Sequence, residues 1–160
     1  MKKFLLLSFV FLTMGHVNAQ TKVYKGSSSY NYDVICNLSD SKVYKKKSSY
    51  SSDVICNIRG EKIYKKNSSY NSDVLYNISD GKVYSGTSSY SSDIVWTIKD
   101  GKIYKGTSTY SSDVIASIRD NKVYTGNSTY SGDIEFTIED YVTIEELIAI
   151  WHAVKYSYQY

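Results

Sequence analysis

Hydrophobic and polar residues recur with a period of twenty along most of the chain, from Thr21 to Asp140. Six consecutive blocks follow the pattern x-K-[VI]-Y-x-x-x-S-[ST]-Y-x-x-D-[VI]-x-x-x-[IL]-x-x, without insertion or deletion. A period in this range is typical of arrays in which one supersecondary unit, too small to bury its own apolar face, packs against its copies. The pattern therefore predicts a tandem repeat protein. Below, the residues of each block are numbered as positions 1 to 20.

Each block boundary has the composition of a β-hairpin. At the fourth boundary, β-branched and aromatic residues in 94–98 precede Asp100-Gly101, and the apolar pair Ile103-Tyr104 follows. An Asp-Gly pair in this setting predicts a two-residue type I′ turn, in which both central residues have positive φ. Three blocks lack Gly or Asn at the second turn position, so that a longer turn or a solenoid corner stays an alternative there: Ser41, Glu61 and Tyr141.

The turn also predicts which residues face one another across the hairpin. Lys99 should lie opposite Lys102, Ile98 opposite Ile103, and Thr97 opposite Tyr104. Because side chains alternate along a strand, one face should be apolar and the other mixed. We predict Ile94, Trp96, Ile98 and Ile103 on the apolar face, and Val95, Thr97 and Tyr104 on the mixed one.

The fold class that follows is all-β, with six tandem 20-residue hairpin repeats at 21–140 in an open, solenoid-like or a closed array. The alternative is a β-solenoid with one coil per repeat. It would stack the six position-13 aspartates, Asp33 to Asp133, into a ladder of like charges about 4.8 Å apart. Such a ladder needs compensation, for instance by turn N–H groups. We favour hairpin repeats.

Position 16 indicates where the interior lies, because its residues are apolar or small but differ in size from block to block, as in a core of uneven shape. At position 15, Glu135 puts a charge where the other blocks have an apolar residue. A polar terminal repeat usually stops further stacking, and we assign that role to Glu135. The position-16 residues are Cys36, Cys56, Tyr76, Trp96, Ala116 and Phe136.

The segment after the repeats, 141–160, changes to a helical pattern. Thr143 and Glu146 form a capping box, and apolar residues then recur at helical spacing. These features predict an amphipathic helix from about Ile144 to Lys155, followed by an aromatic tail. Its expected task is to cover the open end or the interior of the array, since a free sheet edge would recruit another chain.

Residues 1–19 have the features of a secretory signal peptide: Lys2 and Lys3, an apolar stretch at 4–14, and small residues before Gln20. We therefore expect an extracytoplasmic product, in the periplasm, at the cell surface or secreted, with no transmembrane segment after cleavage. Without this leader, which holds two lysines and no acid, 17 basic and 16 acidic residues remain, a net charge of +1. This balance does not favour a nucleic-acid partner.

Residues with catalytic potential are scarce, and we expect no enzyme, no catalytic residue, no cofactor and no metal site. His152 is the only histidine after the leader. Cys36 and Cys56 occupy the same position in adjacent blocks, where neighbouring strands would bring them close enough for a disulfide. Two buried free thiols are the alternative.

The repeated tyrosine at position 10 is the candidate ligand-binding residue, because it lies between serine and threonine residues. Sugars suit such a surface, since their C–H faces pack on aromatic rings while their hydroxyls need polar partners. The alternative is that each ring packs its loop onto the hairpin. The candidates are Tyr50, Tyr70, Tyr90, Tyr110 and Tyr130.

The array resembles, in architecture, the short aromatic repeats of bacterial cell-wall and choline-binding modules. Those families carry a Gly-Trp pair in each repeat, whereas Trp96 is the only tryptophan in the six blocks here, so no binding residue follows from the resemblance. We predict a structural or macromolecule-interaction role at the cell envelope or outside the cell, with another envelope protein as a partner. A module that binds cell-surface polysaccharide is the second hypothesis, and ice binding is the third.

Overall fold

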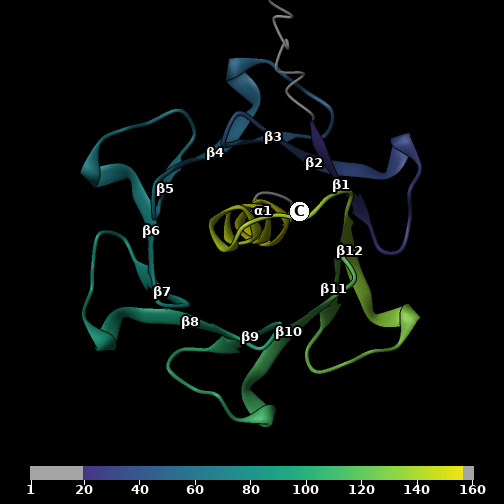
Figure 1. The fold of residues 1–160 in the computed structure, drawn as a ribbon. Coiled ribbons are helices and arrows are strands. Elements are labelled where there is room, and N and C mark those ends of the chain that lie inside the picture. The colour runs from purple at the N-terminus through teal and green to yellow at the C-terminus, as the bar shows by residue number, and fades with distance from the viewer. Residues whose placement is uncertain (1–19, 157–160) are drawn as a thin grey trace, which may run out of the picture.

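The computed structural model describes residues 20–156, in which twelve antiparallel strands close into a barrel around one helix. Six loops project outward from this ring, and α1 lies inside it (Figure 1). The predicted signal peptide and the end of the aromatic tail, 157–160, lie outside the described residues. The strands are β1 (Thr21–Lys25), β2 (Val34–Ser39), β3 (Lys42–Lys45), β4 (Val54–Arg59), β5 (Lys62–Lys65), β6 (Val74–Ser79), β7 (Lys82–Ser85), β8 (Ile94–Lys99), β9 (Lys102–Lys105), β10 (Val114–Arg119), β11 (Lys122–Thr125) and β12 (Ile134–Ile138).

Two kinds of connection alternate around the ring. Tight two-residue turns join β2 to β3, and likewise each later pair up to β10 and β11. Longer loops join β1 to β2, and likewise each later pair up to β11 and β12, and each of these loops ends in one short 3-10 helix. We call these loops, with the last residue of the preceding strand, petals 1 to 6: 25–33, 45–53, 65–73, 85–93, 105–113 and 125–133.

The hairpin prediction at the block boundaries is confirmed. Lys99 pairs with Lys102, Ile98 with Ile103, and Thr97 with Tyr104. Asp100 and Gly101 have φ of 50° and 68°, as a type I′ turn requires. The turn at Asp40-Ser41 also has two positive φ angles, 50° and 57°. Ser41 therefore occupies the left-handed position of a two-residue turn. The longer turn that the sequence left open at this boundary does not form.

The predicted faces of the strand are wrong at two neighbouring positions, Ile94 and Val95. A bulge at Val95 shifts the register between β7 and β8, so that Val83 pairs with Trp96 but Tyr84 pairs with Ile94. An extra residue in one strand reverses the direction of the side chains beyond it. Val95 therefore packs against the interior cluster, whereas Ile94 is buried outside that cluster. The same shift occurs at the equivalent position of each repeat.

Closure of the ring decides between the open and closed arrays. β12 pairs with β1 through Val23–Ile138, Tyr24–Thr137 and Lys25–Phe136, the register that the tight-turn hairpins have. No tight turn joins these two strands. Polar contacts of Glu139 lie at this seam instead: its backbone N–H donates to the carbonyl of Lys22 at 2.9 Å, and its carboxylate accepts from the Tyr24 hydroxyl at 3.2 Å. Hairpin repeats are thus confirmed, and the solenoid alternative is wrong.

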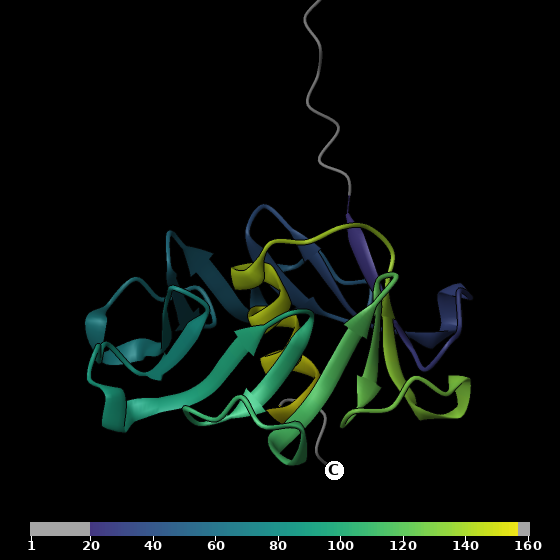
Figure 2. The ribbon, with the colours of Figure 1, turned by 60° about the horizontal axis from the view of Figure 1, so that its bottom comes forward.

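Helix α1 (Ile144–Tyr156) agrees with the predicted bounds to within one residue. The capping box is present: the Thr143 N–H donates to Glu146 at 2.8 Å, and the Glu146 N–H donates to Thr143 Oγ1 at 3.3 Å. The helix runs through the ring (Figure 2). It is therefore buried on several faces rather than on one, through Leu147, Ile148, Ala149, Ile150, Trp151 and Ala153.

The helix lies closer to some repeats than to others. Its backbone lies closest to β2–β5, the strands that carry or flank the small residues Cys36 and Cys56. The Cys56 thiol donates to the Ala149 carbonyl at 3.6 Å. Elsewhere around the ring, Trp96 and Phe136 fill the wider space, and Phe136 lies 6.4 Å from the Trp151 ring. The uneven core that position 16 predicted is thereby accounted for.

Glu135 does not end the array, because a closed ring has no free end. Its carboxylate forms an ion pair with Lys155 on the central helix and accepts a hydrogen bond from Thr125 Oγ1 at 3.0 Å. The Lys155 ammonium also lies 4.8 Å from the centre of the Trp151 ring. The charge at position 15 of the last repeat therefore fastens the helix to the barrel, which corrects the terminal-cap interpretation.

Candidate binding surface on the petals

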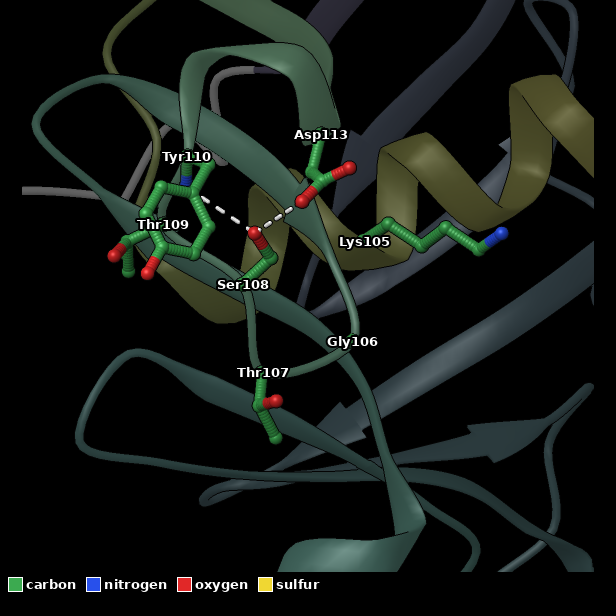
Figure 3. A pocket seen from close by; sticks show the side chains of 7 residues that line it. All are labelled: Lys105, Gly106, Thr107, Ser108, Thr109, Tyr110 and Asp113. Atoms are coloured by element: carbon green, nitrogen blue, oxygen red, sulfur yellow. Dashed lines mark hydrogen bonds between the residues drawn. The ribbon is translucent and has the colours of Figure 1, made fainter.

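Each petal is held in shape by a serine and an aspartate. In petal 5, the Ser108 hydroxyl donates to Asp113 at 2.5 Å and accepts from the Tyr110 backbone N–H at 3.1 Å (Figure 3). The Asp113 N–H donates in turn to the Tyr110 carbonyl at 3.0 Å. Together these bonds fix the backbone on both sides of Tyr110, while its ring is exposed to solvent.

The same network recurs in all six petals, with hydroxyl–carboxylate distances of 2.5–2.6 Å. Each position-13 carboxylate therefore has a partner inside its own petal, and the ladder of like charges that the solenoid would have required does not form. The donor to each carboxylate is a side-chain hydroxyl, whereas the sequence suggested turn N–H groups. The pairs are Ser28–Asp33, Ser48–Asp53, Ser68–Asp73, Ser88–Asp93, Ser108–Asp113 and Ser128–Asp133.

A second polar residue fastens each petal to the barrel wall. Asn57 is 3% exposed, and its amide donates to the carbonyls of Lys66 and Ser68 at 2.7 and 2.9 Å. In the fifth petal, Thr97 Oγ1 donates to the Gly106 carbonyl at 2.7 Å. Buried polar groups that are satisfied in this way make a loop rigid. The mixed outer face of the hairpin is thus covered by the petals themselves.

The five candidate tyrosines are confirmed as solvent-facing, with exposed fractions of 73–79%. Tyr30 of petal 1 is also exposed, and it stacks on Tyr32 with ring centres 5.4 Å apart. The sequence analysis missed Tyr32, which stands at position 12, where the other repeats have serine or glycine. The alternative in which each ring packs its own loop is therefore wrong; the buried tyrosines are those at position 4, such as Tyr104.

The ring separates the tyrosines from one another. Each stands on its own petal, and the petals point outward in different directions (Figure 1). The structure therefore brings together no single cleft lined by these residues. It also lacks, among residues 20–156, the flat tyrosine ladder on which the ice-binding hypothesis depended. What it presents instead is one small aromatic and hydroxyl surface, repeated around a ring.

The expected disulfide between Cys36 and Cys56 is wrong: both are free, fully buried thiols. Cys36 lies on β2 and Cys56 on β4, with β3 between them. Two strand spacings separate their backbones by about 9.5 Å, beyond the roughly 7 Å limit for a disulfide. Burial raises the pKa of both thiols, that of Cys56 to about 12, so neither is a reactive thiolate at neutral pH.

His152 occupies the end of the helix near Tyr76. Its Nδ1 lies 3.1 Å from the Tyr76 hydroxyl, and its ring stacks on Tyr156 with centres 5.3 Å apart. Burial lowers the pKa of His152 and raises that of Tyr76. Within residues 20–156, no group of three or more His, Cys, Asp or Glu side chains is placed to hold a metal ion. Nor does this part of the chain contain a helix long and apolar enough to cross a membrane.

These observations define a class of protein: a closed ring of six hairpin repeats with a helix as its core and repeated aromatic tips outside. A family model described as 6-fold beta flower protein matches residues 18–99 and 72–159, which together cover most of the chain. The chain belongs to the 6-fold beta flower family. That description names an architecture and no activity, and the family is not a known enzyme family. No curated protein and no solved structure matches the chain.

Proposed function

We propose that this protein is a non-enzymatic, extracytoplasmic binding protein whose petals contact a polysaccharide through their exposed tyrosines. The observation that carries the proposal is the exposure of Tyr50, Tyr70, Tyr90, Tyr110 and Tyr130 on loops that hydrogen bonds hold rigid. A loop whose backbone is already fixed loses little conformational entropy when it binds, so more of the contact energy appears as affinity. The neighbouring serine and threonine hydroxyls supply partners for sugar hydroxyls.

The six-fold repetition supports a repetitive partner. One petal offers a single ring and a few hydroxyls, which is a weak site. Several petals that contact one polymer chain act at high effective concentration, and linked weak sites gain affinity by a factor of about 10² to 10⁴. A polysaccharide supplies the same group many times along its chain. The predicted signal peptide at 1–19 supports a location where such polymers occur.

A protein of the cell envelope is the second candidate partner. The surface of petal 4, Ser88-Ser89-Tyr90-Ser91-Ser92, has the composition of antibody loops, in which tyrosine supplies contact area and serine supplies adaptable hydrogen bonds. In this role the ring would act as a rigid structural element. The polysaccharide is favoured because the six equal tips match a partner with repeated groups, whereas a protein surface does not repeat in this way.

A retention experiment on insoluble polysaccharides tests the proposal with the chain that follows Ala19. The decisive variant changes Tyr50, Tyr70, Tyr90 and Tyr110 to alanine, and the matched control changes the same four residues to phenylalanine, which keeps the rings. We expect retention by the natural chain and by the phenylalanine variant, and at least ten-fold weaker retention by the alanine variant. Failure of the natural chain to bind any polysaccharide, or equal retention of all three, would contradict polysaccharide binding.

A further inference from the structure

Petals 2 and 3 differ from the other petals in charge. Petal 2 has three lysines and one aspartate over residues 45–53, and petal 3 has two lysines and one aspartate over 65–73. Petals 4 and 6 have one aspartate each and no lysine, and petals 1 and 5 have one of each. The five lysines of petals 2 and 3 are exposed: Lys45, Lys46, Lys47, Lys65 and Lys66.

Two of these lysines occupy a backbone position that favours glycine. Lys46 and Lys66 have φ of 50° and 48°, in the left-handed region. The equivalent residue in the other four petals is glycine, with φ of 55–59°. A residue with a side chain in this conformation costs roughly 1–2 kcal/mol. Backbone strain that the other four petals avoid at this position points to a use for the side chain.

The two basic petals are also bonded to each other. The Asn67 amide of petal 3 donates to the Ser51 carbonyl of petal 2 at 2.8 Å and to its hydroxyl at 3.1 Å. The start of petal 3, which carries Lys65 and Lys66, therefore lies against the end of petal 2. Petals 2 and 3 have one acid each, Asp53 and Asp73, so five lysines and two aspartates give the two petals a net charge of +3.

We propose that petals 2 and 3 form a subsite for the acidic groups of an anionic polysaccharide. The inference rests on the proposed function and narrows its substrate class. Lysine clusters of this size bind acidic polysaccharides through charge. Tyr50 and Tyr70 stand on the same two petals, so one stretch of polymer meets aromatic rings and ammonium groups together. Petals 2 and 3 are the two petals with a net positive charge, so an acidic chain should be attracted to this side of the ring.

The test variant uses residues that the protein already has at equivalent positions. Changing Lys45→Ser, Lys46→Gly, Lys65→Ser and Lys66→Gly gives both petals the start of petal 4, Ser85-Gly86, and leaves Asn67 in place. The matched control loses four charges elsewhere, by changing Lys62, Lys82, Lys99 and Lys102 to serine. Unfolding midpoints of both variants identify any loss of folding. The probes are dextran sulfate, polygalacturonate, neutral dextran, duplex DNA and vesicles that contain phosphatidylglycerol.

We expect the natural chain to bind dextran sulfate or polygalacturonate at least ten-fold more tightly than dextran, and this preference to fall as NaCl rises from about 0.05 to about 0.5 M. The two acidic polymers distinguish sulfate from carboxylate recognition. The petal variant should lose the preference and the control should keep it. Equal losses in both variants, or tighter binding of DNA or vesicles, would overturn the inference. Binding of neutral and acidic polymers with equal affinity would overturn it while leaving the proposed function intact.

Discussion

The interior of the barrel and the petals outside it come from the same twenty-residue block but use its repetition differently. Inside, position 16 changes from Cys36 to Trp96 to Phe136, because one straight helix cannot contact six equal walls equally. Outside, the Ser-Asp network is the same in every petal, because each petal satisfies its own polar groups. The residues of the barrel that contact the helix therefore vary between repeats. The petal residues, which bond within their own petal, do not need to vary.

The largest difference in stability is expected when one aromatic side chain of the last repeat is removed, either inside the barrel or on a petal. Phe136 is fully buried against Trp151, so Phe136→Ala should lower the free energy of unfolding by about 3–5 kcal/mol. Tyr130 is 79% exposed, so Tyr130→Ala should change it by less than about 0.5 kcal/mol. Urea unfolding measures both. Similar losses in the two variants would remove the distinction between core and petal.

Replacing a residue by the one that another repeat has at the same position should lower the free energy of unfolding inside the barrel but not on a petal. Cys56→Phe introduces the residue that repeat 6 has at position 16, but at a place where the wall lies against Ala149. Overpacking should lower the unfolding free energy by about 1–3 kcal/mol. Thr107→Lys gives petal 5 the residue of petal 2 and should have an effect below about 0.5 kcal/mol. If Cys56→Phe leaves the denaturant midpoint unchanged, the helix does not fit the wall as closely as described.

Removal of the Ser108 hydroxyl tests whether a petal is a local unit that is independent of the barrel. Ser108→Ala leaves Asp113 and the Tyr110 N–H without their partner, which should cost about 1–2 kcal/mol. Because the petal is a local unit, faster hydrogen exchange should be confined to residues 106–113. The neighbouring Thr109→Ala is the control. Exchange that accelerates equally around the whole ring would show that the petals are not independent.

The smallest effect concerns pH. Burial lowers the pKa of His152, so the unfolded chain binds this proton more readily than the folded protein does. Stability from the neutral ring is complete above the unfolded pKa of 6.5 and is lost as the pH falls through the folded pKa. In His152→Gln, the unfolding midpoint should vary less with pH over that range. Parallel curves for the variant and the natural chain would contradict a buried, neutral histidine.

Much of the fold follows from local chemistry that the sequence displays. Asp100-Gly101 determines a tight turn, and this turn determines the pairing of Ile98 with Ile103. Thr143 and Glu146 determine where the helix begins. Among the candidate site residues, the position-10 tyrosines were identified because polar neighbours surround them. The bulge at Val95 could not be predicted, since Ile94 and Val95 are both apolar and the pattern does not show which of them faces the interior.

The sequence by itself determined that this protein is an array of six hairpins with one helix, because turns, strand alternation and helix caps depend on neighbouring residues. Only the tertiary structure decided that the array closes, that the helix lies inside it, and that β3 separates the two cysteines. Closure depends on pairing between residues far apart in the chain, such as Val23 with Ile138, whereas β3 separates the cysteines through pairing with its two neighbouring strands. Because the ring is closed, Glu135 is not an end cap and pairs with Lys155 instead. Closure also places the tyrosines on six petals that point outward (Figure 1).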